Sequence, residues 1–250
     1  MCGILVAAAA LLSPAGALAA AVVTTLKGDV RAGNVQLAPG ARISSGSTVA
    51  LGADAKATLT FDDGMRIVLD RNTTFRITGF VYASDSPASD HVVLDLQRGA
   101  MRMITGTIGK RSPQALALRA PQASIEVRGT DFMVALVNPA FLQVLTGSIA
   151  AVNGAGAVVL AAGTFAQIAN ASSLPVPSSP EAVAEAARGA FARLLEGLDP
   201  VVGLLPDGTT AGAGTSAAAL PTTGTPGAVL MGIGAAAVWV LSNGGSTVRH

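Results

Sequence analysis

Short stretches in which apolar and polar residues alternate recur along most of this chain, between residues 22 and 168. They follow one another at intervals of roughly ten residues, and each has the period-two pattern of a strand with one buried and one exposed face. Turns rich in glycine separate them, and the Asp63-Gly64 dipeptide between two such stretches is a strong hairpin signal. The pattern predicts an all-β domain over residues 20–168, built as a short-stranded β-solenoid or roll, or as a sandwich.

The most distinctive of these stretches surrounds a glycine at position 129. Alternating residues precede and follow this glycine, which permits a positive φ or a close approach of two backbones. The threonine and aspartate that follow can fix the bend through local hydrogen bonds. The residues of this central motif are Arg128, Gly129, Thr130, Asp131 and Phe132.

Residues 120–134, which contain the central motif, resemble the FecR-type domain of bacterial envelope proteins. The spaced segments 46–49, 57–64 and 94–99 are also similar to parts of that family, so that the resemblance covers residues 22–168. It implies an exported all-β binding or sensing module, and it names no ligand.

The signalling members of that family contact a sigma factor through a cytoplasmic segment that precedes a transmembrane helix. Their periplasmic FecR-type domain receives a signal from an outer-membrane transporter. In this sequence the expected β-domain follows an export signal directly, which argues against direct control of a sigma factor and leaves reception of a periplasmic signal open.

The expected signal peptide covers residues 1–19. An apolar run from Ile4 to Leu12 precedes helix-breaking residues, and residues 17–19 read Ala-Leu-Ala, which fits a cleavage site. The usual positive charge at the start is missing, since the first basic residue is Lys27. We expect export to the periplasm or cell envelope with cleavage after Ala19.

After the β-domain the composition changes several times. Residues 169–179 read as a Ser/Pro-rich linker, residues 180–198 as an amphipathic helix and residues 199–226 as a flexible low-complexity spacer. The uncharged segment 227–241 predicts an apolar helix of about 22 Å, short of a hydrocarbon core of about 30 Å. It is either a short membrane anchor or a helix that packs on protein.

The amphipathic helix has one apolar face, which we expect to pack on the β-domain rather than to bind a partner. The residues of that face are Val183, Ala187, Phe191, Leu194, Leu195 and Leu198.

Composition excludes several classes of function. The net charge is +1 without any run of like charge, which argues against a nucleic-acid partner. The single cysteine lies at position 2, and His91 and His250 are the only histidines, so the sequence predicts neither a metal site nor a cofactor. The paired carboxylates Asp62 and Asp63 could serve a glycoside hydrolase, but their place in a turn favours turn hydrogen bonds. We therefore expect no catalytic residues and no enzyme.

Basic residues gather in one part of the sequence, and several of them could share one face of the sheet. Such a face could bind an acidic polysaccharide, a lipid headgroup or an acidic protein loop, because arginine forms bidentate bonds to carboxylate and phosphate. Alternatively, it is a solvated face that keeps the domain soluble. The candidate binding residues are Arg98, Arg102, Arg111, Arg119 and Arg128.

These observations favour an exported, non-enzymatic binding or sensing module of the cell envelope that contacts an envelope protein or polysaccharide. The alternative is a structural or surface-assembly protein that is tethered to a membrane by residues 227–241.

Overall fold

The computed structural model describes residues 19–196 and 240–241, and strands make up most of them. The expectation of an all-β domain is confirmed. The expected signal peptide, apart from Ala19, and the expected spacer at 199–226 lie outside the described residues. Residues 227–239 of the apolar segment lie outside them as well.

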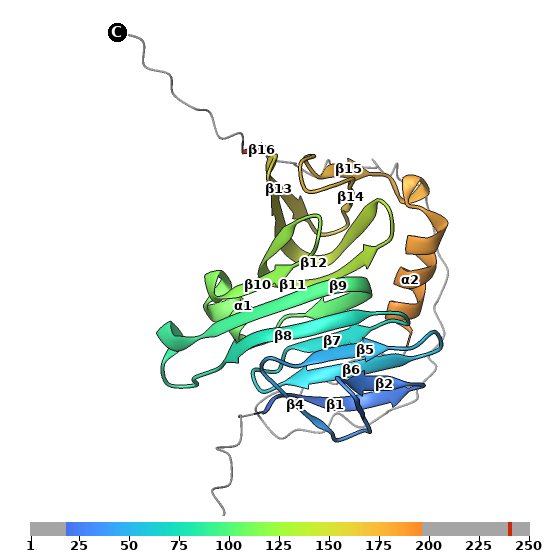
Figure 1. The fold of residues 1–250 in the computed structure, drawn as a ribbon. Helices are drawn as coiled ribbons and strands as arrows, with labels where there is room; N and C mark the ends of the chain where they lie inside the picture. The colour runs from blue at the N-terminus through green and yellow to red at the C-terminus, as the bar shows by residue number, and fades with distance from the viewer. Residues whose placement is uncertain (1–18, 197–239, 242–250) are drawn as a thin grey trace, which may run out of the picture.

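The strands pair into two layers that face each other across the core. In Figure 1 the strands are stacked from the N-terminal end of the domain toward its C-terminal end. In spatial order, the first layer contains β4 (Arg42–Ser44), β1 (Ala19–Lys27), β6 (Lys56–Phe61), β7 (Arg66–Leu69), the second half of β9 (His91–Ile104), the second half of β11 (Ser124–Leu136), the first half of β12 (Ala140–Asn153), β14 (Phe165–Ile168) and β15 (Val176–Ser178).

Strands β9, β11 and β12 are long enough to take part in both layers, and their other halves belong to the second layer. In spatial order, it contains β3 (Val35–Gln36), β2 (Val30–Ala32), β5 (Thr48–Leu51), β8 (Thr74–Val81), the first half of β9, β10 (Leu116–Arg119), the first half of β11, the second half of β12, β13 (Gly156–Ala161) and β16 (Val240–Leu241). The last of these strands contains the final two residues of the segment that was expected to be helical.

Each of the three long strands changes layer at a glycine. Gly99 in β9, Gly129 in β11 and Gly147 in β12 have φ angles of +89°, +62° and +76°. The pairing partners change at the same points: β9 pairs with β8 before its glycine and with β7 and β11 from there on. Because a residue with a side chain rarely adopts such a φ, these glycines set the corners of the fold.

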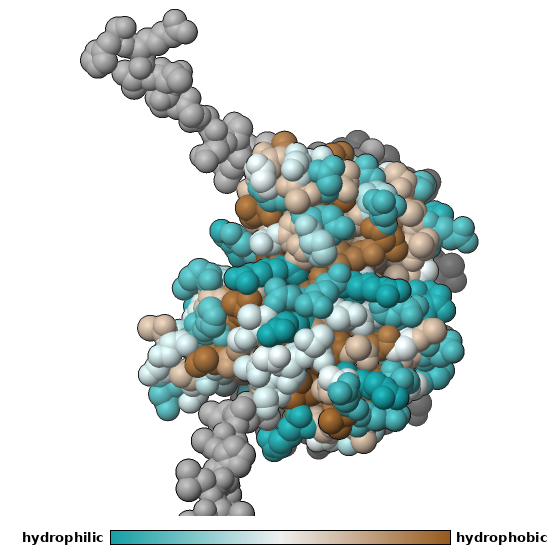
Figure 2. Space-filling view, in the orientation of Figure 1, coloured by the Kyte–Doolittle hydropathy of each residue, from teal (hydrophilic) through white to brown (hydrophobic). Residues whose placement is uncertain are grey.

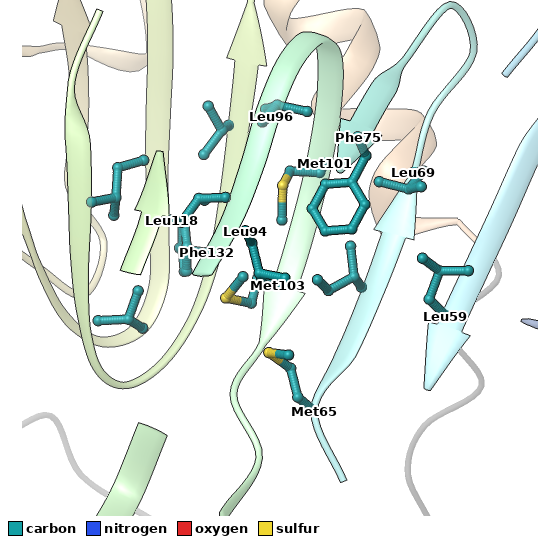
Figure 3. Close-up of a cluster of buried hydrophobic side chains, with 14 of the residues drawn as sticks. Leu59, Met65, Leu69, Phe75, Leu94, Leu96, Met101, Met103, Leu118 and Phe132 are labelled. Carbon is teal, nitrogen blue, oxygen red and sulfur yellow. The ribbon is translucent and has the colours of Figure 1, made fainter. Parts of the chain in front are cut away.

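The space between the layers is filled by aliphatic side chains, methionines and a few phenylalanines. Leu94, Met103 and Phe132 converge there from β9 and β11, as Figure 3 shows, and each is fully buried. On the face drawn in Figure 2, hydrophilic residues form a broad band and apolar residues appear as separate patches. The apolar residues of the alternating stretches therefore pack into one core between the two layers.

The hairpin predicted at Asp63-Gly64 is present, since β6 and β7 pair as antiparallel neighbours on either side of it. One pairing has no local signal in the sequence. Strand β10 lies parallel to the first half of β9, after a crossover through α1 (Thr107–Arg111) and the 3-10 turn η2 (Pro113–Ala115). The tip of the β8–β9 hairpin contains a second 3-10 turn, η1 (Pro87–Ser89).

Helix α2 (Glu185–Leu195) covers part of the outer face of the first layer. It begins later than the sequence predicted because the chain first forms the 3-10 turn η3 (Pro180–Ala182), which Ser179 caps by accepting a hydrogen bond from the Ala182 amide at 3.3 Å. Phe191 is buried against the sheet, whereas Leu195, which was expected on the same face, is 46% exposed.

Residues 169–179 were expected to form a linker. The C-terminal part of this segment lies against the β-domain. It contains β15, which pairs with β14, and the Asn153 side-chain amide donates to the Ser173 carbonyl at 2.6 Å. Among the residues that the structure describes, no helix has the length and apolarity needed to cross a membrane.

Candidate functional site

The central motif forms a corner of the fold, and of its five residues Arg128 lines a smaller pocket together with residues of η2 and β10. Thr130 is buried there, and its hydroxyl donates to the Ser148 carbonyl at 3.0 Å while its amide donates to the Thr105 hydroxyl at 2.8 Å. These bonds tie the corners of β11 and β12 to each other and to Thr105, the residue that follows β9. Phe132 then enters the core. The motif therefore holds the architecture in place.

Asp131 of the motif is engaged by one of the arginines predicted to bind a ligand. Arg102 donates to both carboxylate oxygens of Asp131, from Nε at 2.8 Å and from Nη2 at 2.6 Å. The two side chains are only 13% and 16% exposed. This bidentate pair joins β9 to β11, so Arg102 has its charge satisfied within the fold.

Arg111, the last residue of α1, is also engaged, and its partners lie at the tip of the β8–β9 hairpin. Its guanidinium donates to both oxygens of Asp90, at 2.9 and 2.8 Å, and to the carbonyl oxygens of Ala83 and Ser84. It also lies 4.9 Å from the centre of the Tyr82 ring. These hydrogen bonds from Arg111 lower the pKa of Asp90. Arg111 therefore joins the two ends of the loop at 84–90.

Asp63 and Gly64 form the turn between β6 and β7, and the side chain of Asp63 is buried. One carboxylate oxygen accepts from the Met65 amide at 3.0 Å and the other from the Ile108 amide at 3.2 Å. Asp63 thus satisfies an amide in the first turn of α1. With both oxygens taken by backbone amides, this carboxylate serves the crossover rather than a bond-cleaving pair with the exposed Asp62.

Burial raises the pKa of Asp63 above its ordinary value of 3.8, because desolvation outweighs the hydrogen bonds from Met65 and Ile108, which lower it. A raised pKa means that the folded chain binds a proton more tightly than the unfolded chain. The contribution of this carboxyl to stability is therefore largest below its unfolded pKa and is lost as the pH rises through its folded pKa.

Urea unfolding at several pH values gives the difference in free energy of unfolding between the wild type and Asp63→Asn (wild type minus variant). We expect this difference to decrease as the pH rises from about 3.5 to 7. Asp62→Asn removes one charge from the same turn and is the matched control. A difference for Asp63→Asn that is constant with pH, or that grows with rising pH, would contradict the assignment.

The remaining three predicted arginines are exposed and make no ion pair within residues 19–196. Arg119 and Arg128 lie on β10 and β11 in the second layer. Arg98 lies in β9, immediately before the corner at Gly99, on the rim of a cleft. Of the five arginines that the sequence offers as candidate binding residues, Arg102 and Arg111 are thus paired within the domain, and Arg98 lines this cleft.

The cleft that contains Arg98 has a volume of about 700 Å³ and lies between α2 and the sheet. Arg71, in the turn between β7 and β8, is a second exposed cation on it, and the structure shows no ion pair for Arg71 within residues 19–196. Four segments line the cleft: the turn 70–72, the corner 98–100, the end of β11 at 136–137, and α2 from Glu185 to Arg193.

The rim that carries the two arginines is firmly held. The Thr73 hydroxyl donates to the Ala100 carbonyl and accepts from the Ala100 amide, both at 3.1 Å. Asn72 adopts a left-handed φ of 55°, and its amide donates to the Gly52 carbonyl at 3.0 Å. A Cβ at Gly99 would lie 2.5 Å from the Thr73 Cα, so only glycine fits this corner. The backbones of Arg71 and Arg98 are thus fixed relative to each other.

The opposite wall of the cleft is held by contacts between α2 and the sheet. Arg193 donates to Asp70 from Nε at 3.0 Å and from Nη2 at 2.7 Å, which raises the pKa of Arg193. The Lys56 ammonium donates to the carbonyl oxygens of Arg193 and Glu196 at the C-terminal end of α2. A cation at that end also interacts favourably with the helix dipole.

Sequence reasoning found Arg98 and missed Arg71, Asp70, Arg193 and Lys56. The residues that form the cleft come from parts of the chain up to 123 positions apart, as in the Arg193–Asp70 pair. No local pattern reports such a distance. Within the described part of the chain there is also no group of three or more His, Cys, Asp or Glu residues that could hold a metal ion.

Comparison with known proteins gives one family. Residues 47–150 match the model of the family described as FecR protein. None of the curated proteins matches. Two crystal structures of a candidate anti-sigma factor from Parabacteroides distasonis are similar at 17% identity, with TM-scores of 0.44 and 0.43. Each match covers 53% of this chain and 59% of the other, so this chain spans somewhat more than half of their length.

Proposed function

The chain carries a FecR-type domain over residues 47–150, and from this premise we propose that it is a non-enzymatic binding and sensing module of the bacterial cell envelope. Its partner is an envelope protein or polysaccharide. The observation that carries the proposal is the cleft beside α2, where the guanidinium groups of Arg71 and Arg98 lie exposed on a firmly held rim.

The chemistry of that cleft supports binding rather than catalysis. The described residues that line it include no histidine, cysteine, serine, threonine or tyrosine. Of its two carboxylates, Asp70 is paired with Arg193. Exposed arginines can form bidentate bonds to an incoming carboxylate or phosphate without any change in covalent structure.

Export belongs to the same proposal. The apolar run and Ala-Leu-Ala site in residues 1–19 support cleavage after Ala19 and a periplasmic or envelope location. A FecR-type domain delivered there would receive a signal by binding its partner through the cleft.

The test is fractionation of cells that produce the full chain, with N-terminal sequencing of the recovered protein. The proposal requires a chain that begins at Ala20 and is found in the periplasm or envelope. An intact N-terminus in the cytoplasm would overturn the envelope role. In the envelope fraction, chemical crosslinking of wild type but not of Arg98→Gln to a second component would support contact through the cleft.

A second candidate function, a structural or surface-assembly protein, is favoured by the uncharged segment 227–241. In that case the segment makes the membrane contact and tethers the β-domain. A variant that ends at Pro226 tests it in the same fractionation. Release of this variant into the soluble periplasm, with the full chain in the membrane, would support the tether, and a soluble full chain would exclude it.

A further inference from the structure

The cleft beside α2 has two unlike sides. One side carries the cationic groups of Arg71 and Arg98, which are exposed and have no ion-pair partner within residues 19–196. The other side is the face of α2 at Ala186, Gly189 and Ala190, whose small residues leave room for a chain to lie close to the helix.

The end wall of the cleft is aliphatic. Leu136 and Val137, at the end of β11, are partly buried there and offer apolar contact. No aromatic residue is among the described residues that line the cleft. Sugar rings commonly stack on aromatic side chains, so this lining suits a polysaccharide poorly. It suits a peptide segment that carries carboxylates together with small or aliphatic side chains.

The volume of about 700 Å³ falls within the range of roughly 300–1,000 Å³ that is usual for binding sites. Some of the charged residues that line the cleft are paired with each other, and others are not. Asp70 and Arg193 neutralise each other in a bidentate pair, which leaves two cations and the carboxylate of Glu185 facing an incoming ligand. The excess of positive charge favours an acidic ligand, and Glu185 opposes it.

We infer that this cleft is the docking site for an acidic peptide segment of the partner protein, an inference that rests on the proposed binding function. Carboxylates of the segment pair with the guanidinium groups of Arg71 and Arg98. Aliphatic side chains of the segment contact Leu136 and Val137. The segment lies in extended form along the small-residue face of α2.

The experiment uses the full chain and a fluorescein-labelled hexapeptide in which glutamate alternates with leucine and alanine. Its counterpart has glutamine in place of glutamate. Fluorescence polarisation is expected to show binding of the glutamate peptide, which weakens as salt is added, and much weaker binding of the glutamine peptide. Because a hydrogen-bonded charged group contributes about 1.5–3 kcal/mol, Arg71→Gln and Arg98→Gln should each weaken binding by roughly ten- to a hundredfold.

Two further kinds of variant sharpen the test. Arg119→Gln and Arg128→Gln remove the same charge from exposed arginines elsewhere on the domain, so they should bind like the wild type. Glu185→Gln should tighten binding, by roughly two- to fivefold for the removal of one exposed like charge. Circular dichroism and thermal unfolding check that each variant is folded.

Equal weakening of peptide binding by all four arginine variants would overturn the inference. It would show that binding depends on the net charge of the protein and not on the position of the arginine. Equal binding of the two peptides would overturn the inference as well. An oligogalacturonate, added as a second probe, separates this inference from the proposed function. If the oligogalacturonate binds in an Arg98-dependent manner and the peptide does not, the peptide assignment fails while the binding module stands.

Discussion

Replacement of Gly147 by alanine is expected to lower the free energy of unfolding by roughly 2–5 kcal/mol. Gly147 has a φ of +76° at the corner of β12, and a Cβ built there would lie 2.5 Å from the carbonyl oxygen of Gly129. Alanine therefore adds left-handed strain and a collision with the backbone of the neighbouring corner. Urea unfolding followed by circular dichroism measures the loss.

Gly129 provides the matched control for this prediction. It has a similar φ of +62°, but the nearest atom to a Cβ built there is the Lys110 Cγ, at an ordinary contact distance of 3.8 Å. Gly129→Ala should therefore cost only the conformational strain, about 1–2 kcal/mol. If the two variants lost the same stability, the two corners would not be stacked as the structure shows.

The stacked corners explain which part of the fold could be read from the sequence. Alternation reports which residues of a strand are buried, so the strands, the hairpin at Asp63-Gly64 and the buried Phe132 were predictable. Alternation does not report which strand is the neighbour. It gave no sign that β9, β11 and β12 each serve both layers, although the glycine of the central motif was correctly placed at a bend.

The candidate site was less predictable than the fold, for a related reason. From the sequence, several arginines that are close along the chain could share one face of the sheet. In the structure Arg102 pairs with Asp131 and Arg111 pairs with Asp90, which satisfies their charges inside the domain. The exposed cation that joins Arg98 on the cleft is Arg71, from the turn before β8. The pairing of both β7 and β8 with β9 brings these two arginines to the same rim.

The amphipathic helix was predicted from its period, but its significance for the cleft was not. One wall of the cleft is α2 itself, so the site exists only while α2 is docked on the first layer. Three kinds of contact hold it there: the apolar cluster around Phe191, the Arg193–Asp70 ion pair and the bonds from Lys56 to the last carbonyl oxygens. The helix therefore couples the packing of the domain to its binding site.

We accordingly expect Phe191→Ala to cost roughly 3–5 kcal/mol of stability, and to release α2 from the sheet more readily than it unfolds the β-domain. Phe191 is 4% exposed and packs among residues of the first layer, whereas the inter-layer core does not depend on it. Hydrogen exchange should accelerate in the amides of α2 while the amides of β9 and β11 stay protected. Binding of the glutamate hexapeptide should weaken in parallel.

Leu195→Ala is the control, because Leu195 lies on the same helix and is 46% exposed. It should change stability by less than about 0.5 kcal/mol and leave both exchange and peptide binding as in the wild type. Faster exchange in α2 without weaker binding would show that the peptide does not use the helix wall. Uniformly faster exchange through β9 and β11 would show that helix and sheet unfold as one unit, so that the cleft cannot open without loss of the fold.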